Sequence, residues 1–157
     1  MNRFMQEKWS WIEGSHGLRN EVLDTLTDAD LGFNPGGKNL TLGALLRELG
    51  EIEYSYEQSL KTFKQDWAYR NTASGLDSSV SRLKTWFQQM DADMQATVAA
   101  FSDEDLKKPV DRGGYEMPVE TQLEVYLQAL LIVFGKIVVY FRAMDKPLSK
   151  KLQDWIG

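Results

Sequence analysis

The chain has one histidine and no cysteine, and this limits the metal and nucleophilic chemistry that its residues could support. Glu13-Gly-Ser-His16 has the Glu-x-x-His spacing of di-iron bundles, but such a site needs two copies of the motif and two further carboxylates. A Ser-His-Asp triad needs a positioned nucleophile and oxyanion donors, whereas His16 falls within an expected helix. The absence of cysteine also excludes disulfides, thiolate zinc sites and a cysteine nucleophile. We therefore expect no catalytic residue and no cofactor.

His16 and Arg19 lie on the apolar stripe of the first expected helix, where a buried charge needs a partner. Antiparallel packing against the second expected helix would place Arg19 within a turn of Glu48. The same packing would place His16 near Ile52. We expect an ion pair between Arg19 and Glu48. The alternatives are that Arg19 reaches solvent along its aliphatic stem and that His16 is an ordinary core histidine.

Several acidic residues of the second expected helix, and one that follows it, resemble a metal-binding face: Glu48, Glu51, Glu53, Glu57 and Asp66. A run of like charges along a helix is usually a solvated face, so we expect no metal site there. The paired glycines at 36–37 and 113–114 are typical of turns, and no phosphate-binding glycine pattern occurs.

Five helices must position these residues. The stretch from Val125 to Phe141 is apolar on nearly every side, which predicts a helix buried on nearly every side. Apolar residues at three- and four-residue spacing predict helices over about 3–26, 41–65, 78–101 and 118–144, with a short last helix after Pro147. No segment alternates as a strand does. The sequence predicts a single all-α domain over 1–157, a four-helix bundle whose long link after the second helix lets helices two and three run parallel.

Two short stretches of similar sequence suggest that the chain contains two helical hairpins of the same construction. Leu26-Thr27-Asp28-Ala29-Asp30-Leu31 resembles Phe101-Ser102-Asp103-Glu104-Asp105-Leu106. Each stretch follows a long predicted helix and precedes a loop and another long helix. The distance between them is far too long for a solenoid repeat.

Composition excludes some classes of partner. The net charge is −5 and no dense Lys/Arg stripe occurs, so we expect no nucleic-acid surface. The apolar run of about 17 residues is shorter than the roughly 20 that span a bilayer, so we expect no membrane span. The N-terminal residues lack an apolar signal core, and the absence of cysteine fits a reducing compartment, so we expect a cytoplasmic protein.

Three motifs in order resemble the DinB superfamily. They are Leu-Thr-x-x-x-Leu after the first helix, Thr41-Leu42-Gly43-x-Leu45-Leu46-Arg47 at the start of the second, and Gly135-Lys-Ile-Val-Val-Tyr-Phe-Arg142 late in the fourth. The resemblance implies an up-down-down-up bundle, often dimeric. It also implies a divalent metal held by three histidines in many members, and metal-dependent thiol transferase or hydrolase activity in some.

The sequence departs from this family where the metal would bind. The three histidine positions fall on Glu48, Ala129 and Val133, and alanine and valine carry no donor atom. One carboxylate without an imidazole does not make a three-ligand zinc or nickel site. The resemblance therefore implies a degenerate metal site and no bound metal. We expect a pocket here, lined by six residues: His16, Arg19, Glu48, Ile52, Ala129 and Val133.

Three functions remain open. The first is a non-metal, non-catalytic binding or interaction module, and the second is a metal-dependent thiol transferase or hydrolase of the kind that the resemblance suggests. The third is a bundle that binds a small apolar or aromatic ligand, since the 18 aromatic residues suffice for a pocket as well as a core. The excess apolarity of the fourth helix predicts a subunit interface and a symmetric homodimer.

Overall fold

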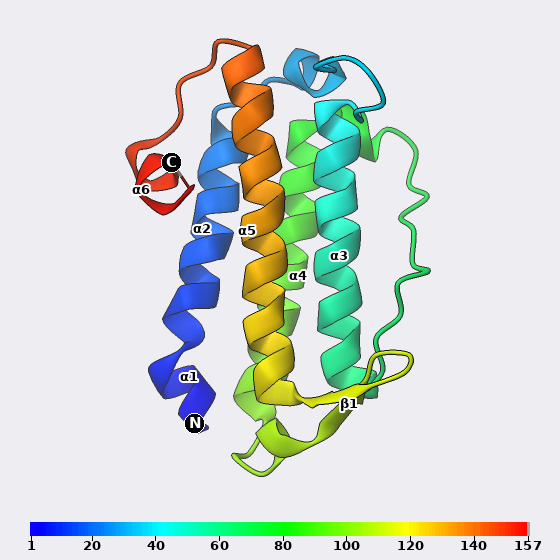
Figure 1. The fold of residues 1–157 in the computed structure, drawn as a ribbon, viewed down its shortest axis with the longest axis vertical. Coiled ribbons are helices and arrows are strands. Elements are labelled where there is room, and N and C mark those ends of the chain that lie inside the picture. Colours follow the sequence, from blue (N-terminus) through cyan, green and yellow to red (C-terminus); the bar gives the residue numbers. More distant parts are fainter. Residues whose placement is uncertain (157) are drawn as a thin grey trace.

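The computed structural model describes residues 1–156 and is dominated by helices (Figure 1). Four long helices pack side by side: α2 (Trp9–Asp24), α3 (Leu42–Thr62), α4 (Val80–Ala100) and α5 (Val119–Ala143). The short helices are α1 (Arg3–Glu7) and α6 (Lys150–Ile156). Three 3₁₀ turns, η1 (Asp28–Gly32), η2 (Leu76–Ser78) and η3 (Asp105–Lys107), lie in the connections. The expected all-α class is confirmed.

Helices α2 and α5 run in one direction and α3 and α4 in the other (Figure 1). Lys146, just after α5, bonds to the Thr25 carbonyl oxygen at the end of α2. At the start of α3, Gly43 lies against η2, which leads directly into α4. A Cβ atom at Gly43 would lie 1.8 Å from the Asp77 carbonyl oxygen, so only glycine permits this approach. The segment between α3 and α4 therefore returns along the length of α3.

Side-chain caps fix where the helices begin. The Thr41 hydroxyl accepts a hydrogen bond from the Ala44 N–H at the start of α3. The two turns of similar sequence also share a pattern of side-chain capping. Thr27 and Asp30 form a reciprocal capping box at η1. Asp105 accepts hydrogen bonds from the N–H and hydroxyl of Ser102 in the same way.

The core lies between the four long helices, and α5 contributes more large buried residues to it than the amphipathic helix α4. The expectation that α5 is buried on nearly every side is wrong. Leu131, Ile132 and Val139 are 36%, 66% and 58% exposed. The reason is that α5 is one wall of the bundle and α6 covers only part of its outer face, with Ile156 near Gly135. By length and composition α5 could cross a membrane, but 44% of its most apolar stretch is already buried inside the bundle.

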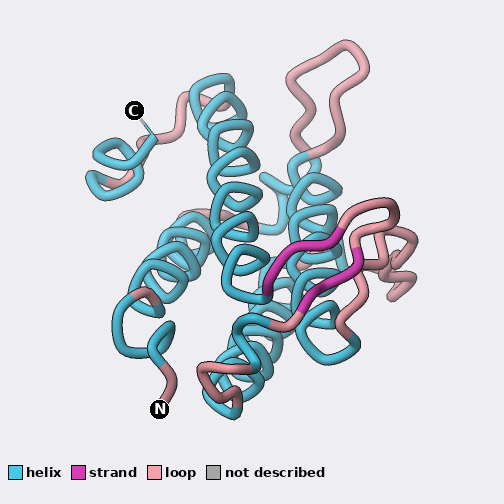
Figure 2. The backbone as a smooth tube through the Cα atoms, turned by 60° about the horizontal axis from the view of Figure 1, so that its bottom comes forward, coloured by secondary structure: helices cyan, strands magenta, loops and turns pink. Residues whose placement is uncertain are grey.

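Two local features differ from the sequence-based expectation. The first expected helix is interrupted at Lys8, whose φ and ψ are −126° and −17°. Two short strands, β1 (Pro109–Asp111) and β2 (Glu116–Pro118), pair antiparallel around the turn that contains Gly113 and Gly114 (Figure 2). Each strand has three residues, which is too short to show an alternating pattern in the sequence.

Candidate functional site

The core contains a closed ring of five polar side chains, which we call the polar ring. His16 and Arg19 come from α2, Glu53 from α3, Asp91 from α4 and Tyr126 from α5. Arg19, Glu53 and Tyr126 are at most 1% exposed, and His16 is 6% exposed. All four long helices therefore meet at one polar layer within the core.

Arg19 bridges two carboxylates. Its Nη1 donates to Glu53 Oε2 at 2.5 Å and its Nη2 donates to Asp91 Oδ2 at 2.6 Å, while the guanidinium lies 4.3 Å from the centre of the Phe87 ring. Burial alone would lower the pKa of Arg19, but the charges of Glu53 and Asp91 outweigh it and raise that pKa above its ordinary value. The guanidinium is therefore a permanent cation inside the bundle.

His16 connects the remaining members of the ring. Its Nε2 lies 2.6 Å from the Tyr126 hydroxyl, and its Nδ1 lies 3.0 Å from Asp91 Oδ1. The Tyr126 hydroxyl also donates to Glu53 Oε2 at 3.3 Å. This Asp–His–Tyr order is that of a base-activated nucleophile. Burial raises the pKa of Tyr126 well above its ordinary value and leaves its side chain out of reach of a substrate. The ring therefore fixes the packing of the four helices.

The expected ion pair between Arg19 and Glu48 is wrong, because Arg19 pairs with Glu53 and Asp91. A residue count along two helices cannot give their relative height to better than about a turn, and it ignored α4 altogether. Sequence reasoning also missed Tyr126. The signal was present for the carboxylates: Glu53 follows Leu49 by four residues on the buried stripe of α3, as Asp91 follows Phe87 on α4.

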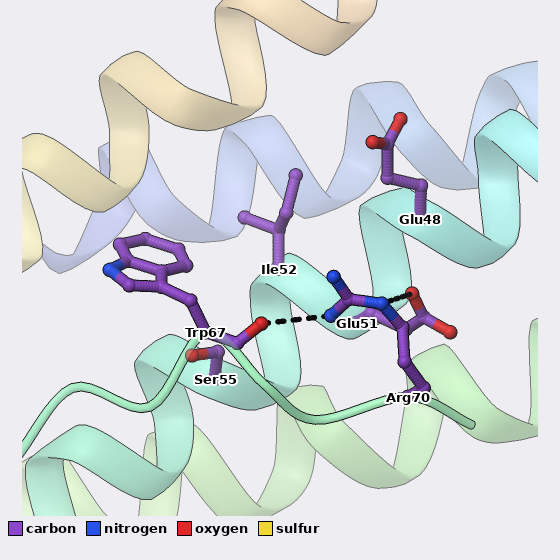
Figure 3. A pocket seen from close by; sticks show the side chains of 6 residues that line it. All are labelled: Glu48, Glu51, Ile52, Ser55, Trp67 and Arg70. Carbon is purple, nitrogen blue, oxygen red and sulfur yellow. Dashed lines mark hydrogen bonds and ion pairs between the residues drawn. The ribbon is translucent and has the colours of Figure 1, made fainter.

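A pocket lies between α3 and the segment that follows it, which runs beside that helix (Figure 3). It has a volume of about 300 Å³ and six lining residues: Glu48, Glu51, Ile52, Ser55, Trp67 and Arg70. We call it the Trp67 pocket. Arg70 is held by its 2.8 Å hydrogen bond to the Trp67 carbonyl oxygen and by Glu51 at 3.8 Å. Figure 3 shows Glu48 apart from these contacts, with no interaction drawn to it.

A second pocket, of about 530 Å³, lies between α3, α5 and the loop before α3. Its lining includes Glu48 and Leu45 from α3, Lys136, Val139 and Tyr140 from α5, and Pro35, Lys38, Asn39 and Leu40 from the loop. We call it the Lys136 pocket. Glu48 thus lines both pockets. It is half-buried, and within residues 1–156 its carboxylate has no hydrogen bond or ion pair. Burial and the charge of Glu48 raise the pKa of Tyr140.

The six residues expected to line one pocket are divided among three places. Glu48 and Ile52 share the Trp67 pocket, and His16 and Arg19 belong to the polar ring. On α5, Val133 is buried in the apolar core and Ala129 is half-buried against it. The two polar regions are therefore separate: a closed ring in the core, and an unpaired carboxylate near the surface.

A helical bundle with parallel middle helices and a polar core layer is the class of protein that this geometry defines. A family model described as the DinB superfamily matches residues 15–129, so the chain belongs to the DinB superfamily. A crystal structure of a DinB-like protein from Bacillus subtilis superposes with a TM-score of 0.71 at 14% sequence identity, covering 90% of this chain and 95% of that chain. No curated protein matches the sequence. The resemblance inferred from the motifs is confirmed.

The three residues that the motif resemblance places at the family's metal positions offer only one donor side chain between them. Of Glu48, Ala129 and Val133, only Glu48 carries a donor atom, and Val133 is 3% exposed within hydrocarbon. The residues of α5 that share a pocket with Glu48 are Lys136, Val139 and Tyr140, and none of them is a histidine or a carboxylate. A zinc or nickel site needs about three protein ligands, so these positions cannot supply one.

Proposed function

We propose that this DinB-superfamily chain is a non-catalytic binding protein that takes a small molecule bearing an organic ammonium group at Glu48. One observation carries this proposal: Glu48 is a half-buried carboxylate without a partner in the described chain, and it lies between two pockets of about 300 and 530 Å³. A carboxylate in such a place attracts a cation more strongly than one in bulk water, because the surrounding dielectric is lower.

The Trp67 pocket favours a cation in two further ways. Arg70 lies beside Glu51, so the charges of these two residues offset each other and the charge of Glu48 remains. The indole of Trp67 adds an aromatic surface, which attracts ammonium groups through its ring quadrupole. The Lys136 pocket has apolar walls from Leu45 and Val139, which suit an apolar body attached to the ammonium group.

Neither polar region supports catalysis. Ser55 contributes a hydroxyl to the Trp67 pocket. This hydroxyl donates a hydrogen bond to the Asp66 carbonyl oxygen and accepts one from the side-chain amide of Gln65. It therefore has no general base beside it. In the polar ring, the Tyr126 hydroxyl is sealed from substrate. The alternative function, a metal-dependent thiol transferase or hydrolase that uses the family's metal positions, would need donor atoms at Ala129 and Val133.

The proposal also includes a homodimer and a cytoplasmic location. Leu131, Ile132 and Val139 expose apolar surface along α5, and a second copy related by a twofold axis would cover it. Sedimentation as a monomer at micromolar concentration would contradict the dimer. The cytoplasmic location rests on the absence of cysteine.

A thermal-shift panel tests the ammonium site. Primary and quaternary ammonium compounds are compared with carboxylates of the same carbon skeleton, because a ligand specific for the folded state raises apparent stability. We expect ammonium compounds alone to raise the Tm, and Glu48→Gln to abolish the shift. Glu7→Gln, at an exposed carboxylate of α1, is the matched control and should keep it. Equal shifts from the carboxylates, or an unchanged response in Glu48→Gln, would refute the proposal.

A further inference from the structure

The polar ring has an unbalanced charge. Glu53 and Asp91 contribute two negative charges and Arg19 one positive charge, so the ring carries a formal charge of −1 while His16 is neutral. Arg19 binds one oxygen of each carboxylate, Glu53 Oε2 and Asp91 Oδ2. The other two oxygens, Glu53 Oε1 and Asp91 Oδ1, are buried without a hydrogen-bond partner. Buried carboxylate oxygens of this kind are costly unless a cation or a donor satisfies them.

Three residues of the ring have ligand atoms that lie near one another. His16, Glu53 and Asp91 each offer one ligand atom, and the three atoms lie within 4.8 Å of one another. Two ligands bound to one zinc-sized ion at about 2.1 Å lie at most about 4.2 Å apart. A small rotation of a carboxylate would therefore bring the three ligand atoms close enough to bind one ion. His16 Nδ1 and Asp91 Oδ1 are already 3.0 Å apart, although their geometry is not that of a hydrogen bond.

Tyr126 and Arg19 would orient these ligands from outside. When the proton of His16 is on Nε2, it can be donated to the Tyr126 oxygen at 2.6 Å, while the Tyr126 hydroxyl donates to Glu53. The lone pair of Nδ1 is then free. A metal-bound histidine nearly always donates its other N–H in this way, and metal-bound carboxylates are held by further hydrogen bonds. Arg19 supplies those hydrogen bonds to both carboxylates.

An ion can reach the ring from the surface. A cleft of about 290 Å³ is lined by Trp9, Glu13, His16, Gly17, Asn20, Asp91 and Gln95. The Asp91 side chain is 24% exposed at this cleft. Glu13 adds a second exposed carboxylate at its mouth. Water from the cleft could complete the coordination of the ion.

We propose that His16, Glu53 and Asp91 bind one divalent transition-metal ion of the zinc, cobalt or manganese class. An imidazole with two carboxylates is a ligand set that these ions accept. The ion would satisfy the two unpartnered oxygens and change the formal charge of the ring from −1 to +1. The site uses α2, α3 and α4 and none of the residues Glu48, Ala129 and Val133, so it stands or falls independently of ligand binding at Glu48.

Titration of chelator-treated, untagged protein with Co²⁺ and Zn²⁺ tests this site, with calorimetry for stoichiometry and visible absorption for cobalt coordination. We expect one equivalent to bind wild type, Glu48→Gln and Glu7→Gln alike. Asp91→Asn should lose at least tenfold in affinity, as should His16→Gln. Asp91→Asn keeps an oxygen for Arg19, so this variant should remain folded, as circular dichroism would verify.

The outcomes separate the possibilities. No stoichiometric binding by wild-type protein would overturn the proposal, and so would unchanged affinity in folded Asp91→Asn. Loss of binding in Glu48→Gln would place the ion at the family's position and would overturn it too. If His16→Gln does not fold, Asp91→Asn decides the result alone.

Discussion

Glu53 and Glu48 lie five residues apart on α3, but they differ in burial and in their partners. Glu53 is 1% exposed and is held by Arg19 and Tyr126 within a ring that joins all four long helices. Glu48 is half-buried, lines two pockets and has no partner within residues 1–156. The same side chain on the same helix is thus part of the core in one case and available to a ligand in the other.

The difference follows from the cost of burying charge. A fully buried carboxylate without a counter-charge costs several kcal/mol, so Glu53 is tolerated only with Arg19 beside it. Glu48 keeps contact with water and needs no partner for folding. Stability therefore explains why Glu53 is paired, whereas it gives no reason for a carboxylate at Glu48. This contrast predicts large effects on stability from substitutions in the ring, and small ones at Glu48.

Arg19→Met should give the largest effect. Methionine fills much of the volume but leaves Glu53 and Asp91 facing each other without their shared cation. We expect a loss of about 3–5 kcal/mol in the free energy of unfolding, measured by urea denaturation in the presence of chelator. Arg70→Met is the matched control, since Arg70 is 66% exposed and its pair with Glu51 should contribute no more than about 1 kcal/mol. A loss below 1 kcal/mol for Arg19→Met would remove the distinction between ring and pocket.

Tyr126→Phe should have an intermediate effect. It deletes only the hydroxyl that contacts His16 and donates to Glu53. Because these buried partners then lack a hydrogen bond, we expect a loss of about 1–3 kcal/mol. Tyr56→Phe is the control, because the Tyr56 hydroxyl has no hydrogen bond within the described residues. If both variants lost the same stability, the hydroxyl of Tyr126 would not be part of a cooperative ring.

The sequence was sufficient to predict the long helices because each of them has an apolar stripe of its own. The positions of Glu53 and Asp91 on such stripes could also have indicated buried carboxylates. Their pairing with Arg19 could not be predicted in the same way. It depends on the relative heights of three helices, and a shift of one turn would have brought another residue of α3 to that level.

The pockets were harder to predict than the core. The Trp67 pocket exists because the segment after α3 folds back on that helix, held by contacts such as the Asn71 N–H bond to Glu51. The stacked rings of Tyr54 and Tyr69 hold the same segment. These contacts join residues far apart in the sequence in a stretch without helical or strand periodicity. No local pattern therefore indicated that Trp67 and Glu48 would line the same pocket.

Glu48→Gln should have the smallest effect on stability, within about 0.5 kcal/mol, because it removes a charge that no described residue pairs with. The substitution should still be visible in a titration. Burial and the negative charge of Glu48 both disfavour the tyrosinate form of Tyr140, which raises its pKa. Removing the charge should lower that pKa towards its ordinary value, while burial keeps it somewhat raised.

Ultraviolet absorbance followed to alkaline pH measures this change as a difference between wild type and variant. Tyr140→Phe identifies the signal, because the hydroxyl of Tyr140, which donates to the Leu40 carbonyl oxygen, is then absent. A pKa of Tyr140 that does not move in Glu48→Gln would show that a counter-ion already neutralises Glu48. A shift together with unchanged stability would show that the carboxylate is charged, unpaired and dispensable for folding, as a ligand-binding residue should be.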